Sequence, residues 1–230
     1  MVKIAILALF LSIPSYAKDF TIPDKRKIIA VIDTGVAKYQ VNKKYMCKGG
    51  VFSSLKDDGI ATHPHGPNVI SIIHKNLDSN KYCIVSIKFL NTGNDGSNMK
   101  NFIWSVKLAS RIKNLFLVNI SAGGAIADES EIKLEIDGYR KILKKGAYLV
   151  VAAGNDHNDL DKQCNFFPAC YKNEIKNDKF IVVGSMLYSS NYGSIVKAIN
   201  SGNNVGFPPM NGTSQAAAQE SSKILNKEGI

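Results

Sequence analysis

Three short motifs carry side chains that can do chemistry together, and they occur in a fixed order along the chain. Asp33 lies in VIDTGV, His65 lies in HPHGPNV, and Ser214 lies in NGTSQAAA. An Asp-Thr-Gly turn suits two chemistries: two such carboxylates can share a proton and activate water, or one can orient an imidazole that activates a hydroxyl. The chain has a single Asp-Thr-Gly, so the first chemistry would need a symmetric dimer, whereas the second uses all three motifs.

The acid–base properties of the three side chains suggest their roles. A serine hydroxyl is a poor nucleophile until a base removes its proton. An imidazole can be that base, provided that an acceptor on its other nitrogen holds the correct tautomer. We therefore predict that Ser214 is a nucleophile, His65 is its general base and Asp33 orients the imidazole.

Apolar runs of strand length recur along the chain and predict the elements that position these side chains. The runs are continuous rather than alternating and are rich in Val and Ile, which is typical of strands buried on both faces of a parallel sheet. They cover residues 27–33, 82–90, 115–121, 147–154 and 179–186. Amphipathic helical patterns lie between them, so the sequence predicts an α/β protein with right-handed crossovers.

Polar residues stand at the ends of three of these predicted strands. Asp33 ends the first, Ser121 ends the third, and Asn155 directly follows the fourth. One such residue by itself would be read as a turn residue or a helix cap. Because sites in open α/β sheets form beyond the carboxyl ends of strands, three of them together predict a shared site.

Six sequence blocks match, in order, the pattern of a known family. They are VIDTGV, HGPNVISII, LVNISAGG, VVAAGN, FPACY and NGTSQAAA. On these blocks the chain resembles the subtilisin-like serine proteases, the subtilases. The resemblance implies a three-layer α/β fold, with a mostly parallel central sheet and helices on both faces. It also implies a serine endopeptidase that works through Asp33, His65, Ser214 and an acyl-enzyme, with Asn155 in the oxyanion hole.

The resemblance also implies how a substrate binds. Subtilases add a peptide as an extended strand between two segments. The matching positions here are Gly96 on one side and Ser121, Ala122 and Gly123 on the other. Phe166 falls where the family forms the floor of the primary specificity pocket, so we expect that pocket to be shallow. The expected partner is a peptide or protein substrate, and no cofactor is implied.

Several positions depart from the family pattern. Pro67 and Asn68 stand where a threonine and a histidine are usual, and Gln215 follows Ser214 in place of a methionine. We also expect no room for a long propeptide between a cleaved signal and Asp33. These departures leave open a second hypothesis, a catalytically weak subtilisin-like binding or regulatory module. An esterase that uses the same triad is a weaker third.

Composition indicates the domain organisation and the compartment. The chain has 230 residues, of which 45% are hydrophobic, enough for one sizeable core and hence one domain. Residues 1–17 combine a short basic start, an apolar run and a small-residue ending, which predicts a secretory signal peptide. A single compact peptidase domain over 18–230 is then expected to be secreted or periplasmic. No later apolar stretch is long enough to predict a transmembrane span.

Charge and cysteine spacing bear on the expected partners. The net charge is +10, but the lysines are scattered and not interleaved with aromatics, so no nucleic-acid footprint is predicted. Four cysteines in an exported chain suggest disulfides. Three pairings are possible, and the short loop between Cys164 and Cys170 favours that pair, which leaves Cys47 with Cys83. The spacings do not suit zinc and residues 74–83 are poor in carboxylates, so we expect no metal. We also expect a monomer.

Overall fold

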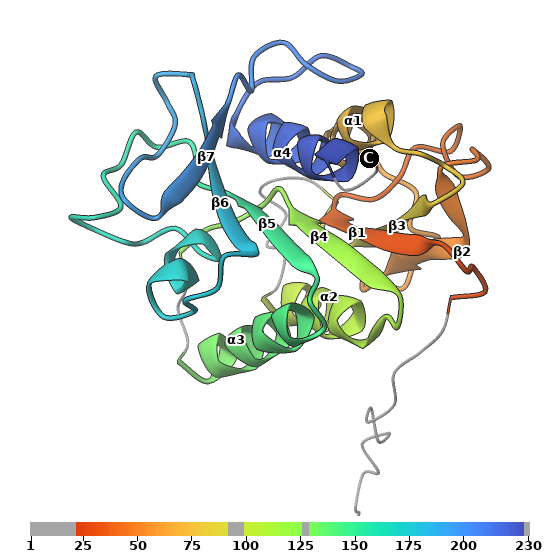
Figure 1. Ribbon diagram of the computed structural model, residues 1–230, viewed down its shortest axis with the longest axis horizontal. Coiled ribbons are helices and arrows are strands. Elements are labelled where there is room, and N and C mark those ends of the chain that lie inside the picture. Colours follow the sequence, from red (N-terminus) through yellow and green to blue (C-terminus); the bar gives the residue numbers. More distant parts are fainter. Residues whose placement is uncertain (1–21, 92–98, 126–128, 228–230) are drawn as a thin grey trace, which may run out of the picture.

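Parallel strands form the centre of the molecule. The computed structural model describes residues 22–91, 99–125 and 129–227, so the predicted signal peptide lies outside the described residues. Within these ranges seven strands form one sheet in the order β2-β3-β1-β4-β5-β6-β7, and every neighbouring pair is parallel (Figure 1). The strands are β1 (Lys27–Asp33), β2 (Met46–Ser53), β3 (Tyr82–Lys88), β4 (Leu115–Ile120), β5 (Tyr148–Ala152), β6 (Phe180–Ser185) and β7 (Val196–Asn200).

Helices cover both faces of this sheet. Helices α1 and α4 pack on one face and α2 and α3 on the other, which makes three layers (Figure 1). The α-helices are α1 (His65–Ile73), α2 (Met99–Arg111), α3 (Glu129–Lys144) and α4 (Thr213–Lys227), and the short 3₁₀ helices are η1 (His74–Asn76) and η2 (Ala169–Asn173). None of the helices in the described ranges is long and apolar enough to cross a bilayer. The predicted fold class is confirmed.

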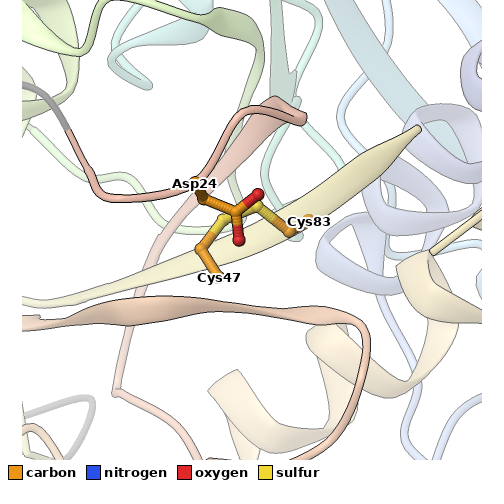
Figure 2. A group of neighbouring side chains, drawn as sticks. All are labelled: Asp24, Cys47 and Cys83. Carbon is orange, nitrogen blue, oxygen red and sulfur yellow. A yellow bond between two sulfur atoms is a disulfide. The ribbon is translucent and has the colours of Figure 1, made fainter. Parts of the chain in front are cut away.

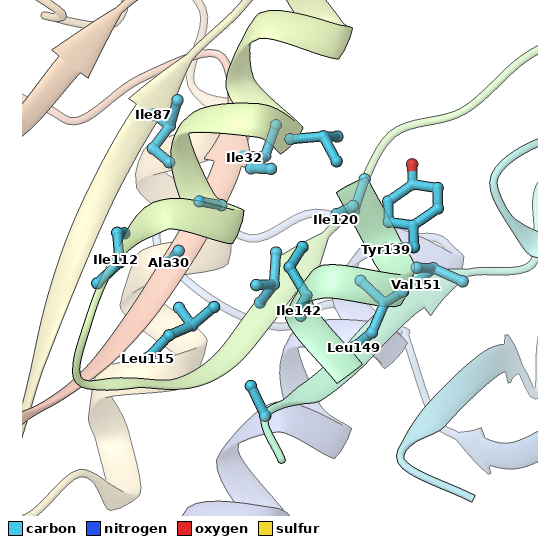
Figure 3. Close-up of a cluster of buried hydrophobic side chains, with 14 of the residues drawn as sticks. Ala30, Ile32, Ile87, Ile112, Leu115, Ile120, Tyr139, Ile142, Leu149 and Val151 are labelled. Carbon is cyan, nitrogen blue, oxygen red and sulfur yellow. The ribbon is translucent and has the colours of Figure 1, made fainter. Parts of the chain in front are cut away.

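Burial on both faces explains why the central strands read as continuous apolar runs. Along β1, Ala30 and Ile32 face α2 and α3, whereas Ile29 and Val31 face α1 and α4. All four side chains are at most 1% exposed. Figure 3 shows the first of these two clusters, in which side chains of the sheet meet those of α2 and α3. Each fully buried aliphatic side chain of this kind contributes about 1.5–3 kcal/mol.

The sequence patterns did not predict the two edge strands of the sheet. Strand β2 has the sequence MCKGGVFS and β7 has VKAIN, and both mix exposed with buried positions. An edge strand is covered less completely than a central one, so its sequence need not be apolar throughout. Five strands were therefore predicted, and seven are observed in the described chain.

Two disulfides hold loops and an edge of the sheet together. Cys47–Cys83 joins β2 to β3. Cys164–Cys170 closes a short loop that leads into η2, and this is the pairing that loop length favoured. Asp24 lies beside the first disulfide (Figure 2), and its carboxylate and the two sulfur atoms lie within 4.8 Å of one another. The sulfur atoms are bonded to each other and the carboxylate pairs with Arg26 at 2.6 Å, so these groups are occupied by other bonds rather than poised for a metal.

Candidate active site

The order of the strands brings the predicted polar residues to one edge of the sheet. Strand β4 lies between β1 and β5, and Asp33, Ser121 and Asn155 stand at or just after the carboxyl ends of these three strands. Helices α1 and α4 begin at the same edge, with His65 and Ser214 in their first turns. All five residues line one cavity of about 540 Å³.

Asp33 and His65 form a hydrogen-bonded pair. The Nδ1 atom of His65 lies 2.8 Å from Oδ1 of Asp33, and the same oxygen accepts the backbone N–H of Thr34 at 2.7 Å. A carboxylate can only accept, so Nδ1 carries the proton and Nε2 is left as the acceptor in the neutral ring. Burial lowers the pKa of His65, but the charge of Asp33 and its hydrogen bond raise it, and the net pKa lies above its ordinary value of 6.5.

A glycine contact holds the start of α1 against the turn after β1. The backbone N–H of Gly66 donates to Oγ1 of Thr34 at 2.8 Å, and that hydroxyl donates to the carbonyl of His63 at 3.1 Å. A Cβ added at Gly66 would lie 2.3 Å from the carbonyl oxygen of Gly35, so only glycine fits there. The close approach sets the position of His65 relative to Asp33.

Ser214 lies in the first turn of α4, where backbone N–H groups have no acceptor within the helix. Its hydroxyl donates to the carbonyl of Ser121 at 2.9 Å. The Ser121 hydroxyl in turn lies 2.9 Å from Oδ1 of Asn119 and 3.0 Å from the carbonyl of Ser214. These bonds tie α4 to the end of β4. A hydroxyl has one proton, so Ser214 must turn away from Ser121 before it can donate to an imidazole.

A backbone hydrogen bond orients the Asn155 side chain. The N–H of Thr213 donates to Oδ1 of Asn155 at 2.9 Å, and the N–H of Gly154 donates to Oγ1 of Thr213 at 3.2 Å. Because the backbone N–H must donate, the partner atom is the amide oxygen, and the amide N–H₂ stays available as a donor. Asn155 is exposed and lines the cavity, so this donor is accessible to a ligand.

Two of the departures from the subtilase pattern bond to each other. Nε2 of Gln215 donates to Oδ1 of Asn68 at 3.0 Å, which links the first turn of α4 to α1. Nδ2 of Asn68 donates to the carbonyl of Val205 at 2.8 Å and to that of Pro208. The altered residues therefore join the two helices that carry His65 and Ser214 with a buried hydrogen bond.

The predicted substrate segment pairs on one side with the chain at Phe167. Gly124 exchanges two backbone hydrogen bonds with Phe167, each 2.9 Å long. Ala122 is half-buried, while Gly123 and Gly124 are exposed and line the cavity. Gly96, predicted for the opposite wall, lies outside the described residues.

Phe166 fills the space between two backbone segments at the cavity wall. A Cβ added at Gly123 would lie 2.5 Å from Cε1 of Phe166, and one at Gly154 would lie 2.8 Å from its Cγ. The carbonyl of Phe166 accepts the N–H of Cys170 at 3.0 Å, and Cys170 is bonded to Cys164. The ring is thus held against both segments by a loop that the disulfide closes.

Solved structures of proteases share this architecture. A lanthipeptide protease matches with a TM-score of 0.69 at 16% identity, covering 86% of this chain and 71% of that chain. The nisin leader peptidase of Lactococcus lactis matches with a TM-score of 0.66 at 15% identity, covering 90% and 80%. A cold-adapted subtilisin-like serine proteinase matches with a TM-score of 0.62 at 20% identity, covering 86% and 73%. The chain has a subtilisin-like fold.

Sequence similarity agrees with this fold. A subtilase-type proteinase of the sexual differentiation process in Schizosaccharomyces pombe is 28% identical over an alignment of 188 positions that covers 76% of this chain. The matched part is 37% of that relative's length, so the chain corresponds to little more than a third of it. No protein-family model matches the chain. The resemblance to subtilases predicted from the sequence motifs is confirmed.

Two further residues of the subtilisin-like cavity were not anticipated as site residues. Glu131 and Glu135 lie one turn apart on α3 and both line the cavity. In the sequence they belong to an acidic first half of a predicted helix, a pattern that the helix dipole explains without any site. Their spacing of four residues, which puts them on one helix face, was the available signal. His63 also lines the cavity, and its Nδ1 accepts the backbone N–H of His65 at 3.3 Å.

Proposed function

We propose that this chain is a serine endopeptidase whose triad is Asp33, His65 and Ser214. The observation that carries the proposal is the 2.8 Å contact between His65 Nδ1 and Asp33 Oδ1, in a cavity that Ser214 also lines. This contact fixes Nε2 as the free basic atom of the imidazole. An imidazole whose Nδ1 is held by a carboxylate can act through Nε2 as a general base toward a nearby hydroxyl.

The residues suggest a reaction in two halves. Ser214 Oγ attacks the carbonyl carbon of the peptide bond while its proton passes to Nε2 of His65, and Asp33 stabilises the imidazolium that forms. The amide N–H₂ of Asn155 and the backbone N–H of Ser214 donate to the oxyanion. Both donors are in position before the negative charge develops, so they stabilise the transition state. His65 returns the proton to the leaving amine. A water molecule then hydrolyses the acyl-enzyme by the same steps and restores the serine.

The substrate is proposed to bind as an extended strand along residues 121–124. The exposed glycines there let a peptide backbone approach closely, and backbone hydrogen bonds would supply affinity without regard to sequence. Phe166 restricts the adjoining pocket to small or medium apolar side chains, since packed interiors resist added volume. We propose that the protein acts outside the cytoplasm. The predicted signal peptide and the two disulfides support that location.

One observation favours a second candidate, a binding module with little turnover. The Ser214 hydroxyl donates to the carbonyl of Ser121, so its proton points away from the base. If the hydroxyl kept this position with substrate bound, the nucleophile would stay inactive. The peptide-binding segment would still serve to bind an extended chain.

Labelling with a fluorophosphonate separates the two candidates, because the reagent reacts with an activated serine. We expect stoichiometric labelling of the wild-type protein and none of Ser214→Ala or His65→Ala. Ser222→Ala is a matched serine control on the same helix, outside the lining of the cavity, and should label normally. An unlabelled, folded wild-type protein would support the binding module, and a labelled Ser214→Ala variant would overturn the assignment of the nucleophile.

A further inference from the structure

We propose that the cavity contains a second recognition element, which binds the cationic side chain of a lysine or arginine in the substrate. We name it the Glu135 recess and define it by Met99, Phe102, Ala122, Glu131 and Glu135. The inference rests on the proposed peptidase function, because the recess and the proposed nucleophile Ser214 line the same cavity. It adds a preference for basic peptides, which the triad and Phe166 do not predict.

The recess joins an apolar wall to a carboxyl group. Met99 and Phe102 come from α2, Ala122 follows β4, and the two glutamates come from the facing side of α3. Glu135 is only 1% exposed, whereas Glu131 is half-buried. Lysine and arginine pair an apolar stem with a charged end, so a cavity wall of this composition matches both parts of either side chain.

Glu135 is held by neutral groups. Oε1 accepts the hydroxyl of Tyr139, and Oε2 accepts that of Tyr171 at 2.8 Å. Each carboxylate oxygen can accept a second hydrogen bond. The two tyrosines bring no positive charge, and no described residue forms an ion pair with this carboxylate, so within the described chain its charge is uncompensated when it ionises. Buried charges are normally paired, and a cation from a ligand would supply the missing partner.

The charge around the cavity is opposite to that of the chain. The chain carries a net charge of +10. Among the described residues that line the cavity there is no lysine or arginine, but there are four acids, Asp33, Glu131, Glu135 and Asp156. The net positive charge disfavours association with a basic peptide overall, whereas the acids of the cavity attract it, an arrangement that favours correctly placed encounters.

The state of Glu135 gives this preference a pH dependence. Burial raises the pKa of Glu135 to about 7; the tyrosine hydrogen bonds oppose that rise and the charge of Glu131 adds to it. The titratable groups against it are Glu131, Tyr139 and Tyr171, and His63 and His65 lie elsewhere in the lining. A lysine side chain should bind more tightly as pH rises through 7 and Glu135 ionises. Titration of His65 changes the turnover of every peptide alike, so its effect cancels in the ratio of the kcat/KM values of two peptides.

The test uses pairs of peptides that differ only by lysine or norleucine, whose stems are alike. The pair is placed in turn at each of the four positions before the cleaved bond, and kcat/KM is measured at pH 8 and pH 6. At one position we expect lysine to be preferred at least about tenfold at pH 8, the size of one charge-assisted hydrogen bond. The preference should shrink several-fold at pH 6. Glu135→Gln should abolish it, and Glu174→Gln, which changes a glutamate outside the cavity lining, should not.

Three results would overturn the proposal. They are no lysine preference at any position, a preference that does not fall at pH 6, and a full preference in a folded Glu135→Gln variant. If that variant did not fold, the wild-type pH dependence and Glu131→Gln, expected to weaken the preference, would decide. Fluorescence anisotropy of the same peptides with the Ser214→Ala variant measures their binding affinity without turnover, and so tests the recess separately from catalysis. A protein that lacks hydrolysis and labelling but binds the lysine peptide more tightly would refute the peptidase and retain the recess.

Discussion

Replacing Glu135 by glutamine should stabilise the protein at alkaline pH and change little at acid pH. The carboxyl is 1% exposed and lies between the hydroxyls of Tyr139 and Tyr171. Burial is the largest influence on its pKa and raises it from the ordinary value of 4.5 to about 7. The folded protein therefore holds this proton more tightly than the unfolded chain does.

The sign and size of the effect follow from that difference. Below about pH 4.5 the carboxyl is protonated in both states, so its contribution to stability is fully present. Between 4.5 and about 7 the unfolded chain ionises first, and stability is lost as pH rises. At 1.36 kcal/mol per pH unit the complete loss is about 3 kcal/mol. That is a large share of the stability of an ordinary domain. Glutamine does not ionise, so the variant escapes the loss.

Urea unfolding followed by far-ultraviolet circular dichroism measures this directly. The free energy of unfolding is determined for wild type and Glu135→Gln at intervals from pH 4.5 to 8.5, at constant ionic strength and with disulfides intact. The variant's advantage over wild type should grow by about 3 kcal/mol across this range. His65 is present in both proteins, so its titration cancels in the difference.

Glu174→Gln is the matched control for this experiment. Glu174 is an exposed glutamate that pairs with Arg140 on the surface, and its replacement should give a difference that stays small across the range. A flat difference for Glu135→Gln, or one that falls as pH rises, would refute the argument that burial dominates at this carboxyl.

Further predictions concern the proposed oxyanion donor, the proposed specificity pocket and the disulfides. Asn155→Ala should lower kcat by about 100–1000-fold, a range taken from the corresponding donor of subtilisin itself, with a much smaller change in KM; an affinity loss with unchanged kcat would make Asn155 a residue that positions substrate. Wild type should cleave after small or medium apolar residues, and Phe166→Gly should raise kcat/KM for substrates with Phe or Tyr there; an unchanged ranking would show that Phe166 does not limit the pocket. Reduction should cost about 2–5 kcal/mol of stability, seen as a lower melting temperature in dithiothreitol, and equal melting with and without reductant would contradict this. EDTA should leave the melting temperature unchanged, and a chelator-sensitive transition would reveal a metal site.

The sequence was informative wherever the requirement is local or repeated along the chain. Central strands such as β1 are covered on both faces, so nearly every position must be apolar and the strand can be recognised in the sequence. The turn after Asp33 and the glycine after His65 depend on backbone geometry that few residues permit, so those motifs stand out. The edge strands β2 and β7 could not be recognised in the sequence, because partial exposure to solvent allows polar residues at many of their positions.

Only the tertiary structure decided what surrounds each side chain. In the sequence, Glu135 is one acid among several on a predicted helix. Its distinctive environment is set by burial and by a hydrogen bond from Tyr171, which lies 36 residues away along the chain. Asn68 and Gln215 likewise read as two unrelated departures, although they bond to each other across 147 residues. Burial and pairing between distant segments determine the pKa and the available donors of a group. Those quantities depend on distances in space, which residue order alone does not specify.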